Sequence, residues 1–295
     1  METVISTTQL TKRYGKTRAV TRLNINVNKG DIYGFIGSNG AGKSTTIRLL
    51  LSLISASSGK AEVFGLDVRR QKRRILSDIG YIPSETSYYP GMRVSDVLRM
   101  SANLRRRDCA MEAQRLCGAL GLDSRRRVEE LSFGNKKKVA IVLALQHKPD
   151  LLILDEATSG LDPLVQKTFW ELLKQRHRQG ATVFLSSHVL SEIQQYCTRA
   201  AIIREGRLVV EDSVAALSGS AAKRVTLHRC AALPEDFPGA LGVTRLEDSV
   251  SFLFHGDYKK LLLDLQQVDF GDISITEPDM EEIFLNFYEK DGETV

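Results

Sequence analysis

The sequence predicts an α/β fold built around a mixed or parallel sheet, followed by a smaller α+β domain. A glycine-rich stretch, residues 37–45, joins a buried strand to a helix with one apolar face. Four apolar residues end in Asp155 and Glu156, as in a strand buried on both faces of a parallel sheet. The composition then loosens to Ala, Ser and Gly around residues 215–222. We therefore predict domains at 1–217 and 218–295.

The composition is ordinary for a globular protein, and 295 residues can form one large domain or two smaller ones. We expect no membrane-spanning helix and no signal peptide, because no apolar run approaches the ~18 residues required. The cysteines form no metal-like cluster, which makes a reducing cytoplasm the simplest setting. They are Cys109, Cys117, Cys197 and Cys230.

Residues 1–30 predict a small antiparallel sheet. Residues 4–10 and 23–27 alternate as strands do, with Tyr14 and Gly15 in the turn between them. The Tyr14 ring could stack on an adenine base, or it could be an ordinary turn tyrosine. The spacing leaves both interpretations open.

The glycine-rich stretch fits the phosphate-binding pattern G-x-x-x-x-G-K-[ST] without a mismatch. Its residues are Gly37, Ser38, Asn39, Gly40, Ala41, Gly42, Lys43, Ser44 and Thr45. Glycines let the backbone approach an anion closely, and loop N–H groups with the following helix N-terminus favour phosphate. Lys43 can bridge the β- and γ-phosphates, and the Ser44 hydroxyl can bind Mg²⁺. The alternative is an incidental glycine-rich turn, which the flanking strand and helix disfavour.

Residues 79–82 predict a short strand that ends before Pro83, and the pattern from about 86 to 147 is helical. Apolar residues recur at helical spacing over 94–100 and 113–120, and Gly121 suits a helix end. We interpret these stripes as core faces of a helical subdomain.

Two strand ends carry candidate catalytic side chains. Asp155 and Glu156 end one buried strand, at the edge where open α/β sheets place their ligands. One carboxylate can hold Mg²⁺, and the next can polarise an attacking water. His188 ends a second buried strand, 181–187, and could reach a γ-phosphate from the same edge. A purely structural role for this histidine is the alternative.

After residue 217 we predict a strand (225–228), a hairpin (243–254), a helix (258–267), a strand (273–276) and a final helix (280–288). This tail contains no catalytic constellation.

Basic residues gather in runs at 105–107, 125–127 and 136–138, within a net charge of +5. Such runs are either solvated faces or a surface for an anionic partner, namely membrane headgroups or nucleic acid. Charge alone does not decide between these interpretations.

With these residues in order, the sequence resembles the ATP-binding subunit of ABC transporters from residue 1 to about 215. In that resemblance Tyr14 is the adenine-stacking residue and residues 37–45 are the Walker A motif. Asp155 ends Walker B, Glu156 aligns with the catalytic glutamate, and residues 159–162 match the D-loop. His188 aligns with the switch histidine. The resemblance implies a P-loop ABC-ATPase core that binds and hydrolyses ATP with Mg²⁺.

The family's LSGGQ signature corresponds here to Leu-Ser-Phe-Gly-Asn at 131–135. In the family this loop acts on the γ-phosphate bound by the other protomer, which implies ATP contacts from Ser132 and Gly134. Phe133 replaces the first glycine and can narrow that approach. Ser84 stands where the family usually has the Q-loop glutamine, and Ala157 replaces a common proline.

The resemblance implies that two ATP-binding domains close head to tail around ATP and drive a separate permease. The ending at 277–284 is similar to ATPases paired with ABC-2-type permeases. We therefore expect a second copy of the chain and an ABC-2-type permease as partners, at the cytoplasmic face of the membrane. The expected task is export of a drug, a peptide antibiotic or a similar substrate, with no nucleic acid bound.

Two other functions stay open at this point. One is a soluble ABC ATPase that acts on nucleic acid or ribosomes through its basic runs. Such proteins usually carry tandem ATPase domains or a long coiled-coil insertion. The other is a regulatory module that binds ATP without hydrolysis, which the altered signature and Q-loop would allow.

Overall fold

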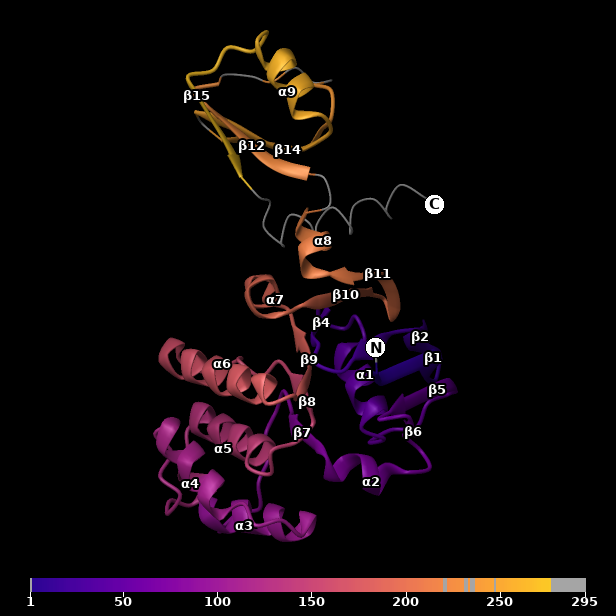
Figure 1. The fold of residues 1–295 in the computed structure, drawn as a ribbon, viewed down its shortest axis with the longest axis vertical. Helices are drawn as coiled ribbons and strands as arrows, with labels where there is room; N and C mark the ends of the chain where they lie inside the picture. The colour runs from indigo at the N-terminus through magenta and orange to yellow at the C-terminus, as the bar shows by residue number, and fades with distance from the viewer. Residues whose placement is uncertain (1, 220–221, 231–232, 234–236, 247, 277–295) are drawn as a thin grey trace. The chain divides into compact units, whose positions relative to one another are not determined.

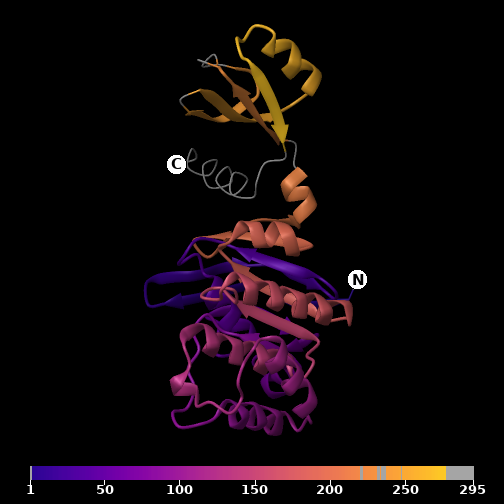
Figure 2. The ribbon, with the colours of Figure 1, turned by 90° about the vertical axis from the view of Figure 1, so that its left-hand side faces the viewer.

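The computed structural model describes residues 2–219, 222–230, 233, 237–246 and 248–276. The chain divides into two compact units, one of Met1–Val189 with Tyr196–Glu211 and one of Leu190–Gln195 with Asp212–Val295. Figures 1 and 2 follow the chain from two directions. The domain boundary at 217/218 stays a prediction. No helix within the described ranges is long and apolar enough to cross a membrane.

The first unit is organised by a six-stranded sheet with the order β11-β10-β4-β9-β8-β7. Its strands are β4 (Ile32–Ile36), β7 (Ile79–Ile82), β8 (Leu151–Asp155), β9 (Thr182–Ser187), β10 (Arg199–Arg204) and β11 (Arg207–Ser213). From β10 to β7 every pairing is parallel. Parallel sheets are covered on both faces, and β4, β8 and β9 are accordingly buried along their whole length. The strands β10 and β11 are not predicted from the sequence.

A five-stranded sheet is built from the N-terminal part of the chain, largely as predicted. Its strands are β1 (Thr3–Tyr14), β2 (Thr17–Leu23), β3 (Asn26–Asn28), β5 (Ser58–Val63) and β6 (Leu66–Asp67). The pairings of β1 with β2, β3 and β5, and of β5 with β6, are antiparallel.

The continuous strand predicted at 23–27 is wrong. The β2 strand ends at Leu23, and β3 pairs with a different part of β1. Between them, side chains replace the ladder: Asn24 Oδ1 accepts from the Gln9 N–H, and Thr7 Oγ1 accepts from the Ile25 N–H. Short polar side chains compete with the backbone in this way and interrupt the strand.

Helices cover both faces of the parallel sheet (Figure 1). They are α1 (Lys43–Leu50), α2 (Lys72–Ser77), α3 (Val94–Arg105), α4 (Ala110–Ala119), the 3₁₀ turn η1 (Val128–Glu130), α5 (Phe133–Leu145) and α6 (Pro163–Arg178). The α5 and α6 helices lie on one side, and α1 with the antiparallel sheet on the other. The α6 helix begins with the predicted proline, and the Asp162 side chain caps it by accepting from the Val165 N–H.

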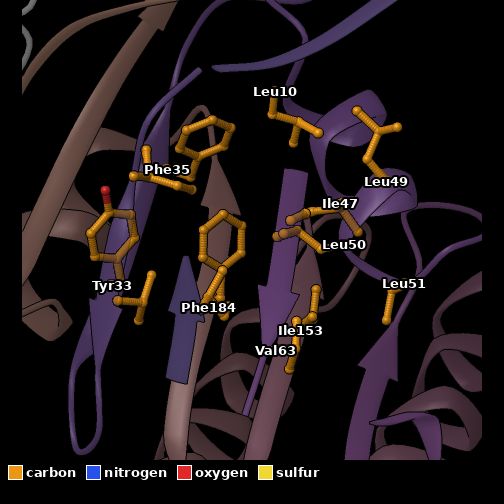
Figure 3. Packing of buried hydrophobic residues seen from close by; sticks show 14 of the residues in the cluster. Leu10, Tyr33, Phe35, Ile47, Leu49, Leu50, Leu51, Val63, Ile153 and Phe184 are labelled. Carbon is orange, nitrogen blue, oxygen red and sulfur yellow. The ribbon is translucent and has the colours of Figure 1, made fainter. Parts of the chain in front are cut away.

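The main core lies between the parallel sheet, α1 and the antiparallel sheet (Figure 3). Phe184 of β9 stacks against Tyr33 of β4 at 5.6 Å between ring centroids and lies 5.3 Å from Phe35. Ile47 and Leu50 of α1 belong to the same cluster of buried residues. This packing holds the end of β4 and the start of α1 in place, and the glycine-rich stretch joins these two ends.

The second unit contains a four-stranded antiparallel sheet in the order β13-β14-β12-β15. Its strands are β12 (Ala222–His228), β13 (Ala240–Leu246), β14 (Ser249–His255) and β15 (Asp272–Thr276), and its helices include α7 (Leu190–Tyr196), α8 (Val214–Gly219) and α9 (Tyr258–Leu265). The predicted strands, hairpin and first helix of the tail are confirmed. The short helix α8 occupies most of the loosened stretch. The predicted helix at 280–288 lies outside the described residues.

Candidate nucleotide-binding site

The phosphate-loop motif connects the buried strand β4 to α1, as its sequence predicts. Gly42 has φ 106°, and a Cβ there would lie 2.4 Å from the Ala19 carbonyl oxygen. A Cβ on Gly37 would lie 2.6 Å from the Ile203 carbonyl oxygen. The Ala41 carbonyl accepts from the Gly206 N–H at 2.9 Å, which ties the loop to the β10–β11 turn. Glycine is therefore required by backbone conformation and by close packing.

Lys43 lies inside this loop, with 5% of its surface exposed. Its ammonium donates to the carbonyls of Gly37 at 2.7 Å and Ser38 at 3.2 Å, and lies 3.7 Å from Glu156 Oε1. Burial lowers the pKa of Lys43, and the carboxylates of Glu156 and Asp155 oppose that shift. An anion bound at this ammonium would favour the charged form of Lys43 in the same way as the carboxylates do. The position of Lys43 therefore suits phosphate binding.

Asp155 accepts hydrogen bonds from two hydroxyl groups that the fold brings to the end of β8. Ser44 Oγ donates to Asp155 Oδ1 at 3.1 Å, and Ser186 Oγ donates to the same oxygen at 2.7 Å. Ser186 lies beside Asp155 because β8 and β9 are paired in that register. Hydroxyl and carboxylate oxygens are ligands that Mg²⁺ accepts, along with water and phosphate oxygens. The donor set of Ser44 and Asp155 therefore fits Mg²⁺.

Glu156 follows β8 directly and has the left-handed backbone φ of 49°. Its N–H donates to the Ser186 carbonyl at 3.1 Å. Its carboxylate Oε1 lies 3.4 Å from Nδ1 of His188, the residue that follows β9. Positive φ at a non-glycine residue costs about 1–3 kcal/mol and persists where surrounding contacts impose it. The parallel strands thus bring Lys43, Glu156 and His188 to one edge of the sheet.

Lys137 is a further residue of this region, which the sequence analysis placed in a surface basic run. It is fully buried, and its ammonium donates to the carbonyls of Pro83, Ser84 and Glu156 at 3.0, 3.0 and 3.1 Å. An ammonium has three donors, and all three are satisfied. Burial lowers the pKa of Lys137, and Asp155 and Glu156 oppose the shift. Helical spacing to the buried Ile141 is the sequence signal that could have revealed this inward position.

The remaining predicted site residues have contacts away from this cluster. Tyr14, 47% exposed, ends β1 with the Lys12 ammonium 4.9 Å from its ring centroid. Ser132 caps α5, and its Oγ accepts from the Asn135 N–H at 3.3 Å.

The Phe133 ring covers Gly160 in the loop before α6. Gly160 has φ 76°, and a Cβ there would lie 2.2 Å from Phe133 Cε1. A Cβ on Gly134 would lie 3.2 Å from the Gly160 carbonyl oxygen. The Phe133 ring is therefore packed against Gly160, while 54% of the surface of Phe133 stays exposed.

Comparisons with known proteins identify the family. A family model described as ABC transporter matches residues 20–159. The bacitracin transport ATP-binding protein BcrA of Bacillus licheniformis is 42% identical over 215 residues, which cover 72% of this chain and 70% of that protein. The chain belongs to the ABC transporter ATP-binding proteins.

Two further ABC proteins support this assignment. The daunorubicin/doxorubicin resistance ATP-binding protein DrrA of Streptomyces peucetius is 36% identical over 256 residues, covering 83% of this chain and 78% of that protein. A solved ATP-binding subunit of an ABC transporter matches with a TM-score of 0.69 and 26% identity, covering 74% of this chain and 92% of that one. The predicted fold class and family are confirmed. The chain is a transporter ATPase, and these relatives do not support a role on nucleic acid or ribosomes.

Proposed function

We propose that this chain powers an exporter of a peptide antibiotic or a drug. The observation that carries this proposal is the 42% identity with a bacitracin transport ATP-binding protein. The match to the daunorubicin/doxorubicin resistance protein covers 83% of this chain, which is more than residues 1–217 alone could provide. That extent supports a C-terminal domain at 218–295 of the kind paired with ABC-2-type permeases. The chain then works at the cytoplasmic face of the membrane, with its helical subdomain at 86–147 docked on the permease.

ATP binding uses the loop and the residues at the strand ends. The N–H groups of the loop and the Lys43 ammonium hold the β- and γ-phosphates, and Tyr14 stacks on the adenine. Ser44 and Asp155 would hold Mg²⁺, which when bound neutralises charge on the phosphates. Glu156 orients or deprotonates the attacking water. His188 and Lys43 stabilise charge that develops on the γ-phosphoryl group.

A second copy of the chain completes each site in this proposal. Ser132 and the backbone of Gly134 reach the γ-phosphate bound by the partner copy, so that ATP joins the two faces. A ligand shifts such an equilibrium through contacts it makes only in the closed state, and hydrolysis removes those contacts. The packing of the Phe133 ring against Gly160 supports a role for this ring in the surface that closes on the partner copy.

Export is tested in a bacitracin-sensitive bacterium that produces this chain together with its permease subunit. We expect a several-fold rise in the inhibitory concentration of bacitracin, and no rise when the chain carries Glu156→Gln. Doxorubicin is tested in parallel. Equal sensitivity of both strains to both compounds, with the complex present in the membrane, would refute the export proposal.

Lys137 is proposed as a positioning residue for Glu156. Its ammonium donates to the carbonyl of Glu156, a residue with a strained backbone φ. It also donates to the Pro83 and Ser84 carbonyls, in the loop where the family usually has a glutamine. Lys137→Gln removes one donor and the charge. We expect kcat for ATP hydrolysis to fall about tenfold or more, because a hydrogen bond to a charged group contributes about 1.5–3 kcal/mol.

The KM for ATP is expected to change little in Lys137→Gln, because the ammonium contacts carbonyls of the protein. Lys138→Gln, on the same helix and with a half-buried side chain, is the matched control and should keep wild-type kcat. Lys137→Arg keeps the charge and should recover part of the rate. Loss of rate with a parallel rise in KM, or an equal loss in the control, would contradict the positioning role.

A further inference from the structure

A cavity of about 790 Å³ lies on the antiparallel sheet and β11, within the first unit. Its lining residues include Arg13, Arg18, Arg22 and Arg207. No aspartate or glutamate is among the residues of the described chain that line it. The cavity is thus a concentration of positive charge that the phosphate-loop motif does not use.

Two irregularities in the strands shape this cavity. The pairing of β1 with β2 shifts between Leu10 and Lys12, and the pairing of β1 with β5 shifts between Thr8 and Thr11. Gln9 and Arg22, at these shifts, have φ of 50° and 48°. Bulges of this kind re-aim side chains and terminate pairing next to functional sites. Both Gln9 and Arg22 line the cavity.

Close packing of backbone atoms in the same region also maintains the shape of the cavity. A Cβ on Gly59 would lie 2.2 Å from the Gln9 carbonyl oxygen, and Gly59 has φ 81°. Arg13 and Arg18 are direct cross-strand partners, and like charges placed opposite each other destabilise a sheet. The sheet therefore carries both backbone strain and charge repulsion at one place.

Four arginines of the sequence runs have a different environment. Arg107, Arg125, Arg126 and Arg127 each pair with a nearby carboxylate. Across the described part of the chain, by contrast, none of the four cavity arginines has a carboxylate within ion-pair distance. The cavity therefore brings together four arginine charges that no nearby carboxylate of the described residues neutralises.

We propose that this cavity binds phosphate groups that together carry at least two negative charges, supplied by neighbouring anionic phospholipid headgroups or by a free polyphosphate. Guanidinium groups bind phosphate through paired N–H donors, and Ser58 adds a polar side chain to the lining. Leu208 is the one large apolar residue in the described lining, which offers little to the apolar face of an acidic peptide. The polar, concave wall favours a compact polyanion.

The test uses the full chain with its nucleotide site saturated by Mg²⁺ and a non-hydrolysable ATP analogue. Inorganic pyrophosphate is titrated by calorimetry, and vesicles of phosphatidylcholine with or without phosphatidylglycerol are tested by co-sedimentation. We expect binding that weakens as salt concentration rises, because these exposed arginines are screened. Pyrophosphate binding without vesicle binding assigns a free phosphate ligand. Binding to phosphatidylglycerol vesicles that pyrophosphate displaces assigns a headgroup.

Matched variants separate this site from general charge. The cavity variant carries Arg13→Gln, Arg18→Gln, Arg22→Gln and Arg207→Gln. The control carries Arg99→Gln, Arg115→Gln, Arg125→Gln and Arg126→Gln, which removes the same charge from arginines that are already ion-paired. The cavity variant should lose at least about tenfold in affinity, because it lacks the four guanidinium groups that would pair with phosphate. The control should bind as wild type does.

Three outcomes would overturn the proposal. The wild-type chain could bind neither pyrophosphate nor anionic vesicles, or the control could lose as much affinity as the cavity variant. A polyglutamate peptide could also bind at the cavity where phosphate does not. If the four-site variant does not fold, Arg13→Gln with Arg207→Gln leaves the strained Arg22 in place and serves for the same comparison.

Discussion

Glu156→Gln is expected to abolish ATP turnover while ATP binding persists. The amide has the size of the carboxylate, but it carries no charge and cannot take a proton from water. The backbone of residue 156 is held by the Ser186 carbonyl and the Lys137 ammonium, so the amide should occupy the same place near His188. General-base assistance contributes about 10²–10⁴-fold, and kcat should fall by that order.

Turnover is measured as phosphate release by the complex with its permease, and binding with a fluorescent ATP analogue. With ATP present, the variant should also accumulate as a dimer in size-exclusion chromatography, because the ligand that joins the copies is not consumed. Glu171→Gln, at an exposed position on α6, is the control and should hydrolyse ATP normally. A Glu156→Gln chain with near-normal turnover would remove Glu156 from the catalytic role.

Lys43→Ala is expected to weaken nucleotide binding itself. The Lys43 ammonium is buried in the loop and is directed at carbonyls and at Glu156, where a phosphate would compete for it. Removing a charged donor costs about 1.5–3 kcal/mol, which corresponds to a Kd for ATP raised about 10- to 100-fold. Equilibrium binding of the fluorescent analogue measures this change.

Lys167→Ala, exposed on α6, removes the same charge at a distance and should leave the Kd unchanged. Lys43→Met keeps the apolar part of the side chain. It therefore shows whether Lys43→Ala loses binding only because the loop collapses. Thermal melting of each variant without nucleotide shows whether the fold is retained. Wild-type affinity in folded Lys43→Ala and Lys43→Met would refute the assignment of residues 37–45 as the phosphate loop.

Local structure could be predicted from the sequence where the pattern lies within consecutive residues. The phosphate-loop motif, the apolar run before Asp155 and the run before His188 each predict a local structure that the fold contains. Because parallel strands end at a common edge, the strand ends could also be expected to meet there. The roles of the individual side chains at that edge stay predictions, for which the variants above are the test.

Signals that depend on partners distant in the chain were missed or misinterpreted. Strands β10 and β11 are not predicted, although Ala200–Ile203 is a buried apolar run, and the strand at 23–27 is interrupted by bonds to Thr7 and Gln9. Lys137 looks like part of a basic surface run until its three carbonyl partners, from two other loops, are seen. Each case turns on a hydrogen-bond partner that is far away in sequence.

The sequence by itself predicted a phosphate-binding loop at residues 37–45, because the loop's glycines, lysine and hydroxyl lie within nine consecutive residues and need little beyond the local backbone. Tertiary structure alone decided that four arginines without an acidic partner in the described chain would line one cavity. Four arginines of the conspicuous basic runs pair instead with nearby carboxylates, and Lys137 is buried. Arg13, Arg18, Arg22 and Arg207 come together because strand pairing joins distant segments, and electrostatic interaction depends on distance in space.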